Sequence, residues 1–147
     1  MRFFVVLCAA LLAAAPLFAQ NVENMGAAAA AQLNDIRMRN GLATLSVSAG
    51  LAQAASAHAR DMQINGFFSH TGSDGTGIGD RARAAGYGFC FIAENISKGP
   101  PNLVQVIDGW MGSTGHRRNI LSEGAREFAV VHAPGDIWVM VLGRPGC

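Results

Sequence analysis

The chain has 147 residues, which suits one domain, and 50% of them are hydrophobic. Its 11 basic and 10 acidic side chains give a formal net charge of +1 at pH 7. A chain this close to neutral has no general attraction for nucleic acid or for an anionic membrane, so we expect neither as a partner.

The N-terminus has the layout of a secretory signal peptide. Met1-Arg2 provides a positive start, residues 3–12 an apolar run, and residues 13–19 a tail of mostly small residues. The apolar run is too short to span a bilayer, so we expect no transmembrane segment. Cleavage after Ala19 would leave one domain over residues 20–147 and place it outside the cytoplasm, in the periplasm or the extracellular space.

Two cysteines would remain after that cleavage, because Cys8 lies in the leader. An even number in an exported chain indicates one disulfide, between Cys90 and Cys147. The loop that it closes is long, so the chain-entropy model gives about 4 kcal/mol of stabilisation. Two unpaired thiols are the alternative.

Helical patterns dominate the first two thirds of the chain. Apolar residues at steps of three and four predict a helix over residues 22–40. A second helix is expected over residues 48–65, with His58 on its apolar face. After a glycine-rich loop, a shorter helix is expected over residues 80–85, and another over residues 103–111 after Pro100-Pro101-Asn102.

Strand patterns dominate the end of the chain. Two β-rich runs, 128–133 and 137–142, flank Pro134-Gly135-Asp136, which is the clearest hairpin signal in the sequence. His132 alternates with apolar neighbours in the first run. Helices followed by strands predict a small antiparallel sheet covered by helices, an α+β fold.

Two of the four histidines have the surroundings of a functional site. His70 follows Phe67-Phe68 and precedes the glycine-rich loop, where an imidazole can bind a divalent metal, move a proton or cap a turn. Taken alone, the structural role is the simpler interpretation. His116 follows Gly112 and Gly115, which predict a break in the preceding helix.

Glu94 lies in an otherwise apolar stretch, residues 89–96. A carboxylate there needs a partner, because burying it unpaired is costly, and a histidine is a natural one. Its neighbour Asn95 could instead hydrogen-bond the backbone and hold the loop.

Ser113 lies three residues before His116, which raises the question of serine catalysis. Its surroundings are not those of the nucleophile elbow that follows a strand, so we do not favour it. Arg117 and Arg118 are interpreted as a solvated helical face, with a small anion-binding patch as the alternative.

Three motifs, in this order and spacing, resemble those of a known family. Phe68-Ser69-His70, Ala93-Glu94-Asn95-Ile96 and the stretch from Trp110 to Leu121 resemble the SCP-like extracellular domains of the CAP superfamily. That superfamily includes cysteine-rich secretory proteins, antigen 5 and the plant pathogenesis-related 1 proteins. The similarity runs over residues 30–144, and Gly115-His116-Arg117 is similar to the bacterial branch.

The resemblance implies a three-layer α-β-α sandwich with a cleft faced by two histidines and two acidic residues. His70 and His116 match the histidines and Glu94 matches the first acid, whereas Ser113 stands where animal and plant members have the second. Some members bind zinc or another divalent cation there. The resemblance therefore implies a metal held by His70 and His116, with one oxygen ligand fewer.

The cleft candidates His70, Glu94, Ser113 and His116 permit three functions. The one we expect is a secreted, monomeric binding module for a small apolar ligand such as a lipid or sterol, a divalent metal or an envelope partner. A metal-dependent hydrolase with Glu94 as base is the second. The third is a structural envelope protein without ligand. No complete catalytic constellation is present, which favours a protein that is not an enzyme.

Overall fold

The computed structural model describes residues 21–146, and all elements named below lie in that range. Strands and helices are interspersed along it. In chain order they are β1 (Glu23–Asn24), α1 (Gly26–Arg39), β2 (Ser46–Val47), α2 (Ala49–Asn65), α3 (Ile78–Ala84), β3 (Phe89–Lys98), α4 (Leu103–Gly112), α5 (Thr114–Ile120), β4 (Glu127–Ala133) and β5 (Ile137–Pro145).

The strands form one sheet in the order β1-β4-β5-β3, joined by antiparallel pairs, and β2 adds to β4 in parallel. The predicted hairpin joins β4 to β5. Gly135 and Asp136 in its turn have φ angles of 83° and 54°, in the left-handed region that tight hairpin turns use. The other partner of β5 is β3, which pairs with it over nearly its whole length.

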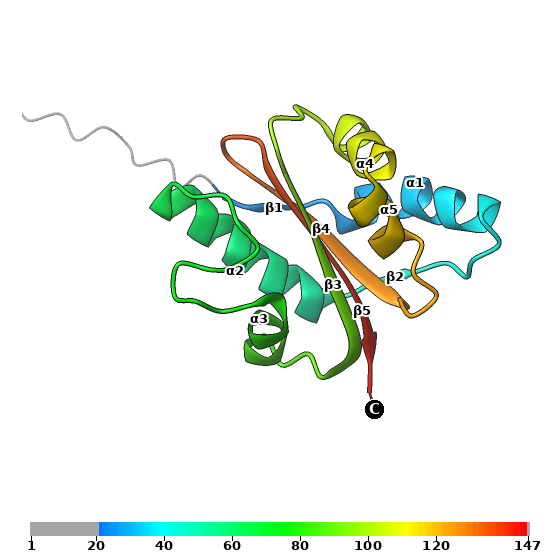
Figure 1. The fold of residues 1–147 in the computed structure, drawn as a ribbon, viewed down its shortest axis with the longest axis horizontal. Helices are drawn as coiled ribbons and strands as arrows, with labels where there is room; N and C mark the ends of the chain where they lie inside the picture. Colours follow the sequence, from blue (N-terminus) through cyan, green and yellow to red (C-terminus); the bar gives the residue numbers. More distant parts are fainter. Residues whose placement is uncertain (1–20, 147) are drawn as a thin grey trace, which may run out of the picture.

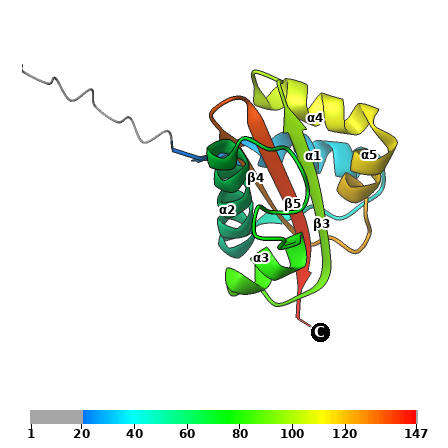
Figure 2. The same cartoon turned by 60° about the vertical axis from the view of Figure 1, so that its left-hand side comes forward.

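Helices cover both faces of this sheet. Figures 1 and 2 show α2 and α3 on one face and α1, α4 and α5 on the other. Each face has its own cluster of buried apolar side chains: Val139 and Val141 of β5 belong to one, and Trp138, Met140 and Leu142 to the other. This alternation buries β5 on both faces and confirms the three-layer α-β-α sandwich.

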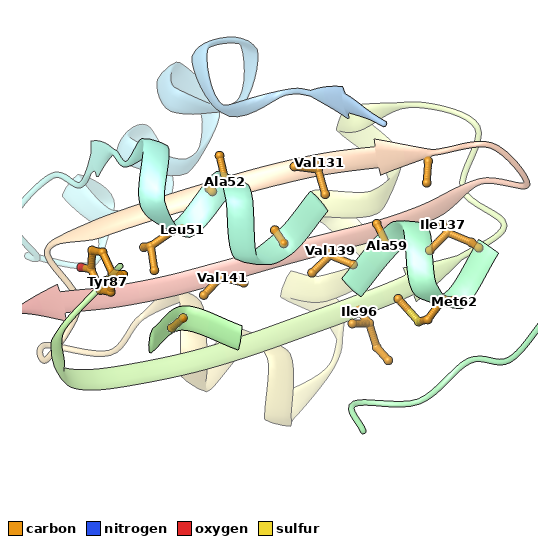
Figure 3. Close-up of a cluster of buried hydrophobic side chains, with 14 residues drawn as sticks. Leu51, Ala52, Ala59, Met62, Tyr87, Ile96, Val131, Ile137, Val139 and Val141 are labelled. Atoms are coloured by element: carbon orange, nitrogen blue, oxygen red, sulfur yellow. The ribbon is translucent and has the colours of Figure 1, made fainter. Parts of the chain in front are cut away.

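The long helix α2 lies along the sheet with its apolar face inward, as predicted. Leu51 and Met62 lie toward opposite ends of that contact, with small alanines between them (Figure 3). Burying one such large side chain contributes about 2 kcal/mol. His58 is on this inward face and has no exposed surface, which confirms its predicted place in the core.

The first helix begins later than the sequence pattern indicates, at Gly26 instead of residue 22. Glu23 and Asn24 pair instead with His132 and Val131 of β4. The side-chain oxygen of Asn24 accepts a hydrogen bond from the Gly26 backbone at 2.9 Å. Tertiary pairing therefore removes one turn from the helix that local periodicity favours.

Two elements around the predicted site were not recognised from the sequence. Residues 89–98 form the long strand β3, and the expected break after Trp110 is confined to Ser113, since Gly115 lies inside the helix α5. A seven-residue helix is too short for periodicity to reveal it.

The predicted leader over residues 1–19 and its cysteine lie outside the described residues, as does Cys147 of the predicted disulfide. Both stay predictions. In residues 21–146, no helix has the length and apolar character needed to cross a membrane.

Candidate functional site

The candidate site is built around the Glu94 side chain, which is only 2% exposed. Oε1 of Glu94 accepts a hydrogen bond from Nδ1 of His70 at 2.8 Å, and Oε2 accepts one from Arg81 at 2.9 Å. The predicted histidine partner is thus confirmed, and an arginine joins it. Together they compensate a carboxylate that would be costly to bury alone.

Arg81, on α3, is a central connector of the site, although its side chain is only 7% exposed. Besides the bond to Glu94, its guanidinium donates to the backbone carbonyls of His70 at 3.0 Å and Thr76 at 2.7 Å. One cation therefore fixes β3, α3 and both ends of the loop that carries His70. The planar guanidinium suits this task because its donors point in several directions at once.

His58, on α2, binds the backbone just before His70. Its Nε2 lies 2.8 Å from the backbone oxygen of Ser69 and 3.9 Å from Oε1 of Glu94. A carbonyl can only accept, so Nε2 carries the proton and Nδ1 has a lone pair. Burial lowers the pKa of His58 below its ordinary 6.5, Arg81 adds to this, and the opposing effect of Glu94 does not offset them.

His70 and His116 lie near one another in the site. The His70 side chain is 58% exposed, and His116 is partly buried. Burial, and then the neighbouring His70, lower the pKa of His116 below its ordinary value. His116 is therefore a neutral imidazole near pH 7, and the two rings are close enough to interact electrostatically.

The backbone of His116 is tied to β3 by two asparagines. Asn95 donates its side-chain amide to the His116 carbonyl at 3.1 Å, and Asn119 donates to the Asn95 side-chain oxygen at 2.8 Å. Asn119 also lies 3.3 Å from the backbone oxygen of Glu94. The expected hydrogen bond from the Asn95 side chain to the backbone is confirmed, and the backbone that it binds belongs to α5.

Adjacent residues of β3 serve opposite layers of the sandwich. Successive side chains of a strand point to opposite faces. Glu94 accordingly reaches His58 and Arg81 on the side of α2 and α3, whereas Asn95 reaches α5 and Met140 on the other side. The site therefore straddles β3, which is an edge strand of the sheet.

The other predicted candidates lie apart from this network. Ser113 separates α4 from α5, and in residues 21–146 no hydrogen bond joins its side chain to His70, Glu94 or His116. Arg117 and Arg118 are exposed, as expected of a solvated face. His132 stacks on Trp138, with the ring centres 4.0 Å apart.

Sequence reasoning missed the contributions of Arg81 and His58 to the site. The one available signal was the need of a buried Glu94 for a cation, but several arginines could have met it. His58 was correctly placed in the core, yet its apolar helical face gave no hint of the contact to Ser69. Both depend on how α2 and α3 pack against β3.

A divalent metal would find fewer protein ligands in this site than in most zinc sites. In the described part of the chain, no group of three or more His, Cys, Asp or Glu side chains is arranged to hold a metal ion. Both oxygens of Glu94 are already engaged, which leaves the two imidazoles as the available protein ligands.

Comparisons with known proteins identify the family of this chain. The model of the Cysteine-rich secretory protein family (CAP) matches residues 30–142, so the chain belongs to that family. The uncharacterized protein YkwD of Bacillus subtilis is 31% identical over 106 residues, 71% of this chain and 41% of YkwD. The uncharacterized membrane protein YlbC of the same organism is 33% identical, over 66% of this chain and 28% of YlbC. This chain thus spans less than half the length of either relative.

Solved structures with the same fold come from other bacteria. An extracellular protein containing an SCP domain from Bacillus anthracis has a TM-score of 0.74 and 29% identity, covering 82% of this chain and 41% of that one. An outer surface protein of Borrelia burgdorferi has a TM-score of 0.73 at 18% identity, covering 82% and 92%. The second likeness shows the fold alone.

Proposed function

We propose that this protein is an exported binding domain whose His70–His116 pair takes up a divalent cation, zinc in the first instance. The main observation behind this proposal is the 2.8 Å hydrogen bond between Nδ1 of His70 and the buried Glu94. Export is supported by the leader-like residues 1–19. It is also consistent with the extracellular and outer-surface descriptions of the two similar structures.

The protonation pattern supports this choice. A carboxylate accepts hydrogen bonds, so Nδ1 of His70 carries a proton, and Nε2 is the ring nitrogen that Glu94 leaves free on a largely exposed ring. Metal-binding histidines are commonly oriented in this way by a carboxylate behind them. His116, neutral for the reasons given above, would supply the second nitrogen, and water would complete the coordination sphere.

Glu94 in this arrangement orients His70 and is poorly suited to act as a base. Its oxygens accept from His70 and Arg81, and it is almost inaccessible to solvent. A general base must reach the proton that it removes. The geometry therefore favours binding over the metal-dependent hydrolase, and the bound species would be held rather than converted.

Exposed apolar side chains in α2 and just after it suit the organic part of a ligand or an envelope partner. Phe68 is 45% exposed and Ile64 is 71% exposed at the end of α2. Such side chains can contact a lipid, a sterol or an apolar protein surface while the metal contacts a polar group. Apolar compounds that copurify with the exported protein would support this extension.

Zinc titration by calorimetry tests the proposal. We expect one site in the purified protein, lost in His70→Ala and in His116→Ala. In Glu94→Gln, zinc binding should weaken by about 10–100-fold, because an orienting partner is lost. His132→Ala is the matched control, since His132 lies on β4 outside the network. Zinc binding that survives both substitutions, or that is lost equally in His132→Ala, would sink the proposed site.

A further inference from the structure

A cavity of about 310 Å³ lies between α2, α3 and the loop of residues 71–77. Its described lining includes His58 and Arg81 but not His70, Glu94 or His116. The cavity is therefore distinct from the site of His70, Glu94 and His116, and Arg81 connects the two by lining the cavity and donating to Glu94. Its volume is at the lower end of the range for small-molecule sites.

The two innermost polar side chains of this cavity are incompletely satisfied. His58 is fully buried and Arg81 is 8% exposed, and both line the cavity. In the described part of the chain, Nδ1 of His58 and Nε of Arg81 have no hydrogen-bond partner. Since Nε2 of His58 donates to the Ser69 carbonyl, Nδ1 of His58 is a hydrogen-bond acceptor that a ligand donor can satisfy.

Two carboxylates converge at the rim of the cavity. A methyl group built on Gly72 would lie 2.8 Å from Oδ1 of Asp74 and 3.2 Å from Oδ2 of Asp61, so both side chains approach one point. Asp61 accepts from the backbone and hydroxyl of Ser73 at 2.8 and 2.6 Å. Asp74 accepts from the backbone and hydroxyl of Thr76 at 2.9 and 2.6 Å.

Both carboxylates are ionised and neither has a cationic side chain as partner in the described residues. Burial raises the pKa of Asp61, but hydrogen bonds from Ser73 and Asn65 outweigh it and leave the pKa low. Hydrogen bonds from Thr76 lower the pKa of Asp74. Two negative charges thus lie near each other, and only neutral groups donate hydrogen bonds to them. A bound cation would stabilise this arrangement.

Most of the remaining wall consists of small apolar side chains, and two polar side chains complete it. The apolar ones are Ala54, Ala57, Ala84 and Ala85, and the polar ones are Gln53 and Asp80. Alanines leave space for a hydrocarbon chain and offer it no competing polar group.

We propose that this cavity binds a small organic ammonium ion carried on a short hydrocarbon chain. The ammonium group donates to Asp61 and Asp74, Nδ1 of His58 accepts a further N–H of the ligand, and the chain lies against the alanines. A cation matches the two unneutralised carboxylates, and the hydrocarbon matches the apolar wall.

The test is titration of the purified protein with n-pentylammonium, followed by calorimetry and by NMR shifts of α2 and α3 amides. The matched neutral probe is 1-pentanol, which has the same chain without the charge. We expect pentylammonium to bind measurably tighter than pentanol. Equal affinity for the two, or no binding of either, would overturn the proposal.

Variants locate the site. Asp61→Asn and Asp74→Asn should each weaken pentylammonium binding by roughly fivefold, the upper range for one partly exposed charge pair. Asp35→Asn is the control, because Asp35 is on α1 and pairs with Arg39. Ala57→Phe fills the cavity from an exposed helical position and should abolish binding without removing a charge. If binding survives in both aspartate variants and in Ala57→Phe, the cavity is not the site.

Two further titrations distinguish the ammonium site from a calcium site and from the His70–His116 site. Calcium chloride replaces the ammonium in the first: if calcium binds with the same dependence on Asp61 and Asp74 while pentylammonium does not, the proposal is wrong. In the second, His70→Ala should abolish zinc binding and leave pentylammonium binding unchanged, whereas Asp74→Asn should do the reverse. The zinc proposal and the ammonium proposal are therefore tested independently.

Discussion

At the scale of single residues, Glu94 is the side chain on which the site depends. It is almost fully buried, yet His70, Arg81 and, at longer range, His58 approach it. A buried ion pair of this kind contributes little net stability against apolar side chains, but breaking it leaves one charge exposed to a low dielectric. Among these residues, substitution of Arg81 should therefore lower the free energy of unfolding most.

We predict that Arg81→Met lowers the free energy of unfolding by about 3 kcal/mol, because Glu94 loses its cationic partner while it stays buried. Urea denaturation measures this. Arg83→Met is the control from the same helix: Arg83 is 66% exposed, so its loss should cost less than about 0.5 kcal/mol. Adding Glu94→Gln to Arg81→Met should restore part of the stability, and equal effects of the two arginine variants would contradict this account.

At the scale of elements, the edge strand β3 joins the two helical layers into one site. Its outer side is covered by side chains from α4 and α5: Trp110 donates to the Ile96 carbonyl at 3.4 Å and Asn119 approaches the Glu94 carbonyl. Covered edges are protected from pairing with other strands. Such contacts hold α5, and with it the backbone of His116, against β3.

We predict that Asn119→Ala loosens α5 without unfolding the domain. The variant loses the bond to the Asn95 side chain, worth about 1 kcal/mol, so amide hydrogen exchange within α5 should accelerate by roughly fivefold. Arg118→Ala, an exposed neighbour in the same helix, should leave exchange unchanged. Exchange that accelerates equally across α2 would instead indicate a global loss of stability.

At the scale of the whole molecule, the sheet brings the end of the chain back to its middle. Phe89 pairs with Pro145, and the Gly146 backbone donates to Gly88 at 3.4 Å, so β5 ends beside Cys90. This register is compatible with the predicted bond to Cys147, which lies outside the described residues. Such a bond would close a long loop across most of the sheet.

We predict that Cys90→Ser lowers the free energy of unfolding by about 4 kcal/mol, the chain-entropy value for a loop of this length. Urea denaturation with and without reductant measures it, since reductant should destabilise the native protein and leave the variant unchanged. Alkylation of both thiols in the denatured, non-reduced protein would rule the disulfide out.

Local patterns were sufficient where an element is stabilised mainly by its own periodicity or turn chemistry. The apolar face of α2, the helix after Asn102 and the turn at Gly135 were all predicted and are present. Local patterns were insufficient where pairing between strands distant in sequence determines the secondary structure. Residues 22–25 are helical by pattern but partly join the sheet, and β3 becomes a strand through its long pairing with β5.

The sequence by itself determined the α+β class, the family, and the three residues His70, Glu94 and His116, because their motifs and spacing are local. Only the tertiary structure decided how they work together. Arg81 and His58 reach Glu94 because α2 and α3 pack on one face of β3, and Asn95 reaches α5 because the next side chain of a strand points to the other face. Contacts between elements distant in sequence depend on packing, which no local pattern encodes.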